Sequence, residues 1–171
     1  MKMIGVIDNG YEYDLKKINR KVVRGIGIKE GKVLMIYSDR YDNYFFPGGG
    51  KRYFETAEEC LKREIKEETG IVIKNISKPI GYIDEVKMHR NNYLFVQRTS
   101  YYFYEIDRLE SANRERHEAS YETVLVSLEE AIEKNNKVTE DLNFVKRELM
   151  VLNKLKGDYY ERIQGRKRIR K

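Results

Sequence analysis

The sequence is short of the residues that build several common kinds of functional site. A single cysteine among 171 residues excludes an internal disulfide and any metal centre with several cysteine ligands. The two histidines, His89 and His117, have no metal-ligand spacing between them, which favours ordinary surface roles. No apolar run approaches the length of a membrane span, and the N-terminal residues contain no cleavage-like site. These absences predict a cytoplasmic protein without a membrane partner.

Charged residues, by contrast, are abundant. They make up 36% of the chain against 40% apolar residues, which fits a soluble protein, and 171 residues suffice for one domain with a substantial core. The net charge of +6 indicates an anionic partner, either a nucleotide phosphate or a nucleic acid, although a modest positive excess serves solubility equally well. The final six residues, RKRIRK, predict a disordered tail, and an RNA contact through it is the alternative.

The order of the expected elements indicates a mixed α and β fold. Stretches rich in β-branched and aromatic residues predict strands near Gly5–Tyr13 and at Val22–Ile28, Val33–Tyr37, Tyr44–Phe46, Ile71–Lys74, Ile80–Val86, Tyr93–Ile106 and Tyr121–Val126. A hairpin turn with glycine is expected at 29–32, a further turn at 89–92, and a charged loop at 107–120.

Two helices are expected after the last strand. Ser127 caps the first, with Glu130 as its capping-box partner, and Thr139 begins the second. The buried side of the second is expected to contain Leu142, Val145, Leu149 and Leu152. The chain is thus divided into an N-terminal extension at 1–16, with one strand packed on the domain, a domain at 17–156, and a basic tail at 157–171.

The clearest predicted helix covers residues 57–69. Thr56 is a good N-cap residue, Glu59 completes a capping box, and Gly70 stands where a left-handed C-cap belongs. The face of this helix that should pack against the core begins with apolar residues, among which Cys60 fits as a small core hydrophobe. The second half of the same face is acidic, which is unexpected for a core helix.

The acidic residues of that face are Glu64 and Glu68, and Glu67 lies beside them. Carboxylates so close together on a partly buried face repel one another unless a positive group lies between them. Oxygen ligands on a rigid helix suit a hard divalent cation such as Mg²⁺ or Mn²⁺. A solvated acidic face is the alternative, but a glycine-rich loop immediately before the helix favours a metal site.

The same segment resembles the signature of a known enzyme family. Gly49 is followed after five residues by Glu55, and after seven more by the run REIKEETGI at Arg63–Ile71. This spacing is similar to the complete signature of the Nudix hydrolases. The hairpin before it, the lead-in FPGG at 46–49 and the run VSLEEAI at 126–132 also resemble family features, so that the likeness extends over most of the chain.

The resemblance implies a fold and a reaction. It implies an α+β fold in which a mixed sheet is sandwiched between helices in three layers, α/β/α, with a loop-helix-loop metal site and a C-terminal helix. It also implies Mg²⁺-dependent hydrolysis of a phosphoanhydride bond in a nucleoside diphosphate linked to another moiety, such as a nucleoside triphosphate or a nucleotide sugar. Hydrolysis at the 5′ end of RNA and nucleotide binding without hydrolysis are the alternatives, and a homodimer remains open.

The resemblance also implies roles for particular residues. Glu64, Glu67 and Glu68 would be metal ligands, together with the carbonyl of Gly48. Glu64 and Glu67 would thereby take part in catalysis, as would Arg63, which would hold a catalytic glutamate by an ion pair. Glu64, or a carboxylate near it, can act as the general base. Glu55 and Gly49 would support this arrangement, because glycines allow the backbone to turn sharply into the helix.

Residues outside the signature are weaker candidates. A further carboxylate is expected from the loop after the long strands, where Glu118 is favoured because it precedes the strand at Tyr121 by a short turn. Arg24, Arg40 and Lys51 are candidates for contacts with substrate phosphate; each is otherwise an ordinary surface charge.

Two departures from the usual family pattern concern the substrate. Arg52 stands where relatives often have glutamate, and Phe54 stands where they often have glycine. Both positions are variable in the signature, so the metal site is unaffected. The departures do, however, weaken the transfer of any particular substrate from familiar members of the family.

Overall fold

The computed structural model describes residues 1–10, 15–89, 93–110 and 121–164 of the chain. These residues form a sheet of nine strands. The strands are β1 (Met3–Ile7), β2 (Lys17–Lys29), β3 (Lys32–Ser38), β4 (Asn43–Phe45), β5 (Gly48–Gly50), β6 (Ile71–Lys74), β7 (Gly81–His89), β8 (Tyr93–Leu109) and β9 (Tyr121–Val126). The helices are α1 (Ala57–Thr69), α2 (Leu128–Asn136), α3 (Asn143–Asp158) and α4 (Tyr160–Ile163). None of these helices is both long enough and apolar enough to cross a bilayer.

The sheet is mixed and strongly curled. Its main path runs β1-β7-β8-β2-β3-β4, while β5 pairs with β2, β6 with β8, and β9 with β3. The pairs β1–β7 and β2–β8 are parallel, and the other pairs are antiparallel. The parallel β2–β8 ladder is the longest, extending from Lys17 opposite Leu94 to Gly27 opposite Tyr104. It brings into register two segments that are more than 70 residues apart in the sequence.

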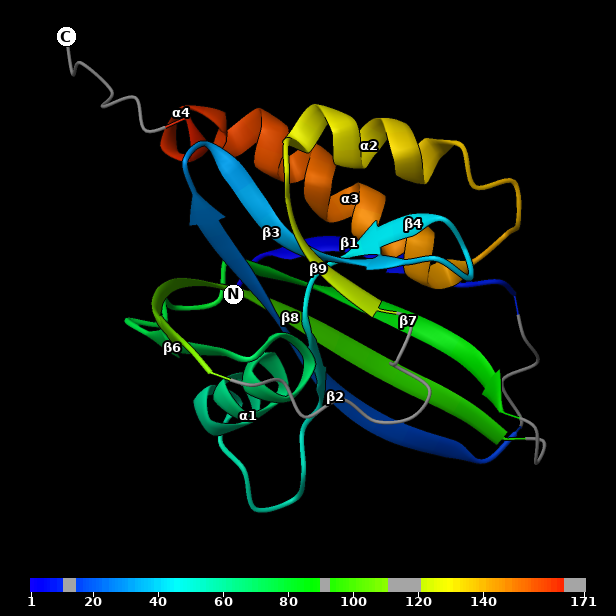
Figure 1. The fold of residues 1–171 in the computed structure, drawn as a ribbon. Coiled ribbons are helices and arrows are strands. Elements are labelled where there is room, and N and C mark those ends of the chain that lie inside the picture. Colours follow the sequence, from blue (N-terminus) through cyan, green and yellow to red (C-terminus); the bar gives the residue numbers. More distant parts are fainter. Residues whose placement is uncertain (11–14, 90–92, 111–120, 165–171) are drawn as a thin grey trace, which may run out of the picture.

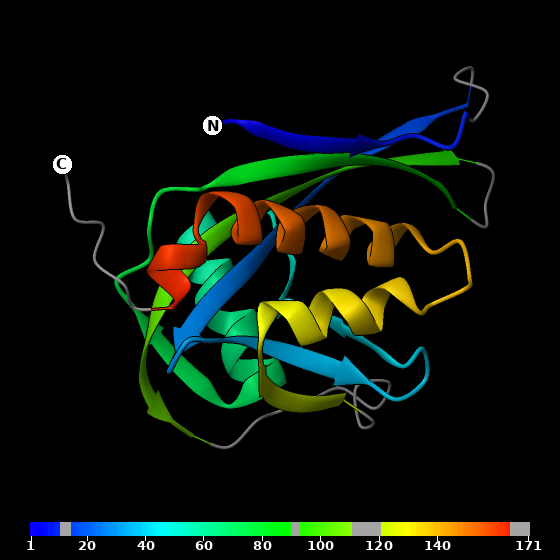
Figure 2. The same cartoon turned by 90° about the horizontal axis from the view of Figure 1, so that it is seen from above.

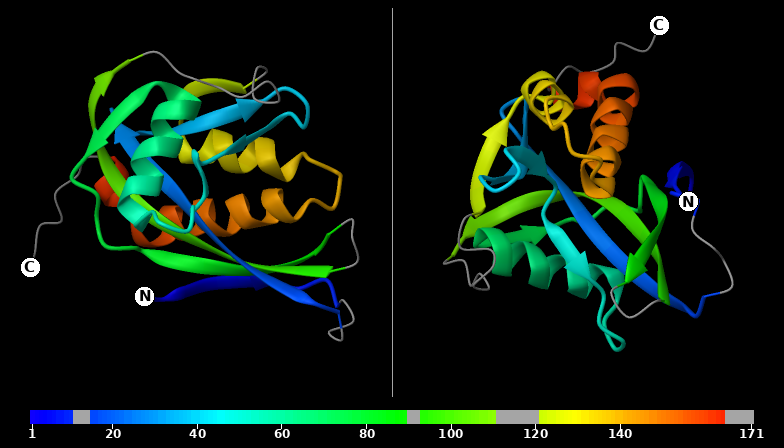
Figure 3. Two further views of the ribbon diagram at one scale, coloured as in Figure 1. Left: turned by 90° about the horizontal axis from the view of Figure 1, so that it is seen from below. Right: turned by 90° about the vertical axis from the view of Figure 1, so that its right-hand side faces the viewer.

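The helices cover the sheet on both faces, so the predicted α/β/α sandwich is confirmed. Figure 1 shows α1 below the sheet and α2 with α3 above it, and the side view in Figure 3 shows the same three layers. Seen from above, α2 and α3 lie side by side and antiparallel (Figure 2). The larger core contains Phe46, Tyr101 and Leu152 under α2 and α3, whereas the smaller one packs Leu61 and Ile65 of α1 against Val23.

Several predicted boundaries were wrong. The first strand lies earlier than Gly5–Tyr13, because Met3–Ile7 pairs with β7 at the sheet edge. The strand predicted at Val22–Ile28 begins at Lys17, since its first residues pair with β8. The start of the predicted loop at 107–120 belongs to β8, where Leu109 pairs with Ile71 of β6, and residues 111–120 lie outside the described part. The glycines at 48–50 form strand β5 along β2.

The C-terminal helix also differs from its prediction. It begins at Asn143 with Leu142 as an N-cap that makes no side-chain bond, so Thr139 does not start it. Its buried residues are Val145, Arg147, Glu148, Val151, Leu152 and Leu155. Regular structure continues beyond residue 156, through Asp158 and into α4, and the basic residues 165–171 lie outside the described part.

Candidate active site

Helix α1 begins and ends as its sequence predicts. The hydroxyl of Thr56 accepts the amide proton of Glu59 at 3.2 Å, and the carboxylate of Glu59 accepts the amide proton of Thr56 at 2.7 Å, which completes the capping box. Gly70 adopts a left-handed conformation with φ of 73° and donates its amide proton to the carbonyl of Lys66. Both ends of the helix are therefore fixed by local hydrogen bonds.

The packing of α1 fixes which way its carboxylates face. Cys60, Leu61 and Ile65 are fully buried in the smaller core, and the side of the helix beside them contains Glu64 and Glu68. Glu68 is itself buried, the side chain of Glu64 is 16% exposed and that of Glu67 is 38% exposed. The acidic groups are thus anchored by the apolar residues one turn away from them.

Arg63 connects three of the acidic residues predicted for the site. Its Nε donates to Oε1 of Glu55 at 2.5 Å, and its Nη2 donates to Oε2 of the same carboxylate at 3.0 Å. Its Nη1 donates both to Glu64, at 2.8 Å, and to Glu67, at 3.0 Å. One guanidinium group therefore holds the carboxylates in fixed positions and offsets their mutual repulsion.

This ion-pair cluster shifts the titration of its members. The hydrogen bonds from Arg63 hold the pKa of Glu55 down at about 2, and Arg63 has a raised pKa chiefly because of the same bonds. Glu55 also accepts the amide proton of Arg52 at 2.9 Å, which ties the loop before the helix to the cluster. Burial, by contrast, raises the pKa of Cys60 to about 12. Cys60 is therefore an unreactive core thiol.

The glycines of β5 allow the carboxylates to approach the backbone. Gly48 has φ of 137°, and a β-carbon there would lie 2.2 Å from the carbonyl oxygen of Val23, so that no other residue fits. The amide of Gly48 donates to Oε2 of Glu68 at 2.7 Å. At Gly49 the obstacle is different, because a β-carbon would lie 2.4 Å from the carboxyl carbon of Glu64.

A cavity of about 430 Å³ opens above these glycines. Glu64 and Glu68 line one part of it. Four cationic side chains line it as well, namely Arg20 and Arg24 of β2, Lys87 of β7 and Arg147 of α3. Acidic groups that suit a metal ion and basic groups that suit phosphate thus face one space, which we call the phosphate cavity.

A buried ion network supports the basic groups of the phosphate cavity. Arg147 lies 2.8 Å from Glu85 and 3.0 Å from Glu148, and Lys87 lies 3.1 Å from Glu85. Burial lowers the pKa of Lys87. Burial alone would raise the pKa of Glu85, but the positive charges of Arg147 and Lys87 have the larger combined effect, and the pKa of Glu85 is lowered. Glu85 and Glu148 are fully buried, and their negative charges balance the positive charges of Arg147 and Lys87 inside the protein.

The same network fixes the strand that leads into the glycines. The amide of Phe46 donates to Oε2 of Glu148 at 3.0 Å, and the carbonyl of Phe46 accepts from Arg24. The carbonyl of the next residue, Pro47, accepts the amide proton of Gly25 at 2.9 Å. Helix α3 is thereby coupled through Phe46 and Pro47 to Gly48, which contacts Glu68.

The donor set of the site suits a hard cation. Within the described ranges, however, no three acidic, histidine or cysteine side chains are already gathered closely enough to hold a metal ion. Glu64 and Glu67 are engaged by Arg63, and Glu68 by the amide of Gly48. A cation in the phosphate cavity would meet Glu64 and Glu68 directly, whereas Glu67 would have to be drawn from Arg63. Carboxylate oxygens fit Mg²⁺ or Mn²⁺ in kind.

The structure separates the three predicted phosphate contacts. Arg24 lines the phosphate cavity. Arg40 does not line it; its guanidinium lies 5.0 Å above the ring of Tyr41. Lys51 is also absent from its walls, because its ammonium group donates to the carbonyls of Arg52 and Glu55 within its own loop. The predicted carboxylate Glu118 lies outside the described residues.

Sequence reasoning missed Arg20, Lys87 and Arg147, which complete the basic side of the cavity, and the buried Glu148. A signal was present for Arg147 and Glu148, which fall on the buried side of α3 between Val145 and Leu152. Glu64 and Glu68 of α1 show the same pattern of a charged residue on an otherwise apolar helix face. Nothing local marks Arg20 or Lys87, which come from different strands.

Comparison with known proteins adds to this geometry. A family model described as NUDIX domain matches residues 19–147. A Bacillus subtilis (strain 168) protein, provisionally named 8-oxo-dGTP diphosphatase YtkD, is 37% identical over 81 residues. That match covers 47% of this chain and 46% of the relative, so the chain is aligned with about half of the relative's length.

Solved structures with the same fold have much lower sequence identity. The Escherichia coli ORF135 protein superposes with a TM-score of 0.55 at 19% identity, covering 87% of this chain and 99% of that one. An ADP-ribose pyrophosphatase from Streptococcus suis 89-1591 gives 0.54 at 15% identity, covering 82% and 94%. A MutT NUDIX hydrolase from Burkholderia pseudomallei gives 0.55 at 17% identity, covering 79% and 98%. At such low sequence identity, the similarity to these structures shows the fold alone.

Proposed function

The chain belongs to the NUDIX family, and on that premise we propose that it hydrolyses a phosphoanhydride bond in a nucleoside diphosphate linked to another moiety. The observation that carries the proposal is the phosphate cavity, where Glu64 and Glu68 face the same space as Arg24, Lys87 and Arg147. A diphosphate brings several negative charges, which the basic side chains can bind. The acidic groups supply what a metal ion and an attacking water require.

The proposed cofactor is Mg²⁺, or Mn²⁺ in its place. Glu64, Glu67 and Glu68 would hold it, with the carbonyl of Gly48 as a further ligand. When bound, such an ion neutralises phosphate charge and acidifies a water molecule. The site fits this role because its donors are oxygens and because Glu64 and Glu68 already line the cavity.

The protein's own residues divide the remaining work. Glu64, or a carboxylate near it, takes the proton of the attacking water as general base. Arg63 fixes the positions of Glu64 and Glu67, and Glu55 fixes Arg63 in turn. Arg24 and Arg147 stabilise the charge that grows on the phosphoryl oxygens. Both side chains form ion pairs with Glu148, so they are already in place before the substrate binds.

A nucleoside triphosphate and a nucleotide sugar are the two candidate substrates. The name of the Bacillus subtilis relative includes 8-oxo-dGTP, and the Streptococcus suis structural neighbour is named as an ADP-ribose pyrophosphatase. Both compounds contain a nucleoside 5′-diphosphate unit, and they represent the two candidate classes. Both therefore belong in a substrate test.

The experiment is a substrate panel assayed after metal removal by EDTA and again after addition of Mg²⁺ or Mn²⁺. It includes the nucleoside triphosphates, 8-oxo-dGTP, ADP-ribose and 5′-triphosphorylated RNA. We expect release of a nucleoside monophosphate from at least one nucleotide, or of pyrophosphate from the RNA, and only with metal. Glu67→Gln should lower kcat by about a hundredfold or more without unfolding the protein. Glu58→Gln, which affects only an exposed pair with Lys62, is the matched control.

Two outcomes would redirect the proposal. A Glu67→Gln variant as active as the wild type would remove the metal site from the mechanism. Binding of nucleotides without turnover of any compound would indicate that the protein binds nucleotides but does not hydrolyse them. Turnover of the RNA alone would favour the RNA 5′-end alternative, and deletion of residues 166–171 would then test whether the basic tail contributes.

A further inference from the structure

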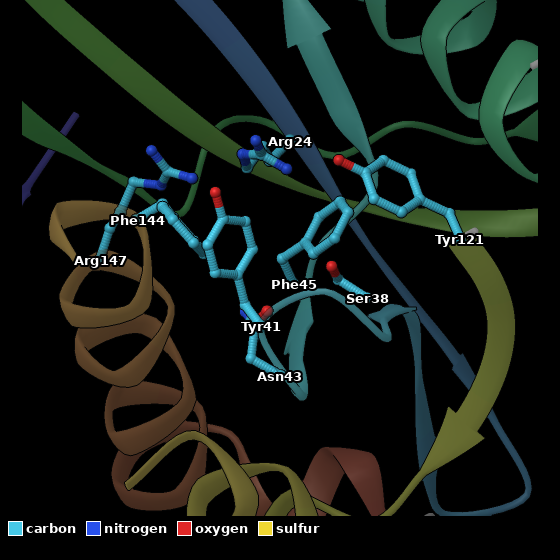
Figure 4. Close-up of a pocket in the computed structure, with 8 residues that line it drawn as sticks. All are labelled: Arg24, Ser38, Tyr41, Asn43, Phe45, Tyr121, Phe144 and Arg147. Atoms are coloured by element: carbon cyan, nitrogen blue, oxygen red, sulfur yellow. The ribbon is translucent and has the colours of Figure 1, made fainter. Parts of the chain in front are cut away.

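A large cavity lies apart from the candidate active site. Its volume is about 580 Å³, and none of its lining residues also lines the phosphate cavity. The smaller pocket of about 160 Å³ in Figure 4 is different, because it shares Arg24, Phe144 and Arg147 with the phosphate cavity. The smaller pocket therefore belongs to the site already described, whereas the larger cavity is a separate space.

The larger cavity lies where the parallel strands β2 and β8 separate. Their ladder ends with Gly27 opposite Tyr104. Beyond that pair, Lys29 of β2 continues along β3, whereas Ile106 of β8 continues along β6. Figure 1 shows the two strand ends separating at the left of the molecule, with α4 above them. In open α/β sheets, ligands bind in a crevice beyond the carboxyl ends of parallel strands that part in this way. We call this space the fork cavity.

The fork cavity and the phosphate cavity lie towards opposite ends of the same strand. Arg20, Val22 and Arg24 of β2 line the phosphate cavity, and Ile28 and Lys29 of β2 line the fork cavity. A strand rises about 3.3 Å per residue, so Arg24 and Ile28 are about 13 Å apart along β2. A ligand in the fork cavity therefore does not compete with substrate phosphates for the same side chains.

Two cationic side chains line the fork cavity without an anionic partner. Lys29 and Arg162 are exposed and form no ion pair with any residue in the described part of the chain. The guanidinium of Arg162 lies 4.1 Å from the centroid of the Phe103 ring, which fixes its position at the cavity wall. An arginine positioned in this way loses less entropy when its N–H groups bind a carboxylate or a phosphate.

The acidic lining residue of the fork cavity already has a partner. Glu105 accepts a hydrogen bond from the side-chain amide of Asn75 at 2.7 Å. Two cationic groups against one carboxylate leave a positive excess in the walls. The charge of the cavity therefore favours an anionic ligand.

A buried hydroxyl without a partner stands at the same place. Tyr104 lines the fork cavity and is 5% exposed, and its hydroxyl has no hydrogen-bond partner among the described residues. A β-carbon on Gly27, the residue before Ile28, would lie 2.6 Å from that hydroxyl oxygen, which places it at the end of β2. A buried hydroxyl without a partner is costly, and a ligand that pairs with it recovers that cost. Ile28, Phe103 and Ile106 add apolar surface to the walls.

We propose that the fork cavity is a second binding site, which takes a small organic anion. The phosphate or carboxylate group of the ligand pairs with Lys29 and Arg162, and its apolar part lies against Ile28 and Phe103. The hydroxyl of Tyr104 donates a hydrogen bond to the ligand. The volume of about 580 Å³ suits such a molecule, since small-molecule sites measure roughly 300–1,000 Å³. A nucleic acid strand is less suitable, because it needs a longer basic groove.

The test is a titration that follows the backbone amide signals of the protein by two-dimensional NMR. The probes are phenyl phosphate, phenylacetate and, as a neutral molecule of similar shape, benzyl alcohol. We expect at least one anion to shift the signals of Lys29, Glu105 and Arg162 saturably, with a Kd of about 1 mM or lower. Benzyl alcohol should bind about tenfold or more weakly. The two anions show which head group the site prefers, and the signals of Gly48–Gly50 report separately on the phosphate cavity.

Matched variants locate the anion. Lys29→Gln and Arg162→Gln should each weaken its binding about tenfold at the fork cavity, without changing the response of Gly48–Gly50. Lys32→Gln is the control, since Lys32 is an exposed lysine of the same hairpin that does not line the cavity. Shifts confined to Gly48–Gly50, equal binding of benzyl alcohol, or unchanged affinity in both variants would overturn the proposal. Because hydrolysis is not measured, the result is independent of the proposed function.

Discussion

The carboxyl group of Glu64 lies directly against Gly49, so that a β-carbon at position 49 would stand 2.4 Å from its Cδ atom. The glycine is needed there for space, and the observed position of the Glu64 carboxyl group depends on the absence of a side chain at residue 49. The same carboxylate is held on its other side by Arg63 at 2.8 Å. Glu64 is thus confined between a backbone strand and a guanidinium group.

Gly49→Ala should therefore displace Glu64 without unfolding the protein. A shift of about 1 Å in a reacting group can cost about a hundredfold in rate, and we expect kcat to fall by that order. The measurement is the hydrolysis rate beside the thermal unfolding midpoint. Gly157→Ala is the control, because a β-carbon there meets nothing within 4 Å. Equal rates for Gly49→Ala and the wild type would show that Glu64 does not need this position.

Stability at low pH should depend on Glu55. Hydrogen bonds from Arg63 lower the pKa of Glu55 from 4.5 to about 2 in the folded protein, so its ionised form favours folding. That contribution is fully present above about pH 4.5 and is lost as the pH falls towards 2. The difference in unfolding free energy between the wild type and Glu55→Gln should consequently shrink between pH 5 and pH 2, as denaturant titrations can measure. A difference that stays constant across this range would contradict the prediction.

Removal of the buried carboxylate of Glu148 should be strongly destabilising. Glu148→Ala leaves Arg147 with one partner fewer and the amide of Phe46 without its acceptor, at a cost of about 3–5 kcal/mol in unfolding free energy. Glu133→Ala breaks an exposed pair with Lys137 and should cost about 1 kcal/mol or less. Equilibrium denaturation of both variants checks the contrast. Similar losses for the two would mean that the buried network adds little to stability.

The thiol of Cys60 should be unreactive in the folded protein. Burial raises its pKa to about 12, so little thiolate exists at pH 8, and the side chain is fully buried. A thiol-specific chromogenic disulfide should therefore react slowly with the native protein and rapidly after denaturation. Fast labelling of the native protein would show that the helix opens readily at this position.

Short-range features of the sequence were enough to define α1 and its acidic side. The capping box at Thr56 and Glu59, the C-cap at Gly70 and the helical spacing of Glu64 and Glu68 depend on residues at most four positions apart. These interactions join residues that are close in the sequence and need no tertiary contact, so the sequence pattern is enough to predict them. The layered fold followed from the order of the elements and from the family resemblance.

The other side of the site was decided only by tertiary structure. Arg20 and Arg24 come from β2, Lys87 from β7 and Arg147 from α3, and they meet because the parallel β2–β8 ladder and the packing of α3 bring these elements together. Arg20, Arg24 and Lys87 look like ordinary surface charges in their local sequence. The sequence by itself therefore determined the helix that presents the carboxylates. Long-range strand pairing and core packing determined which cations share the cavity with those carboxylates, because these contacts join segments that no local pattern relates.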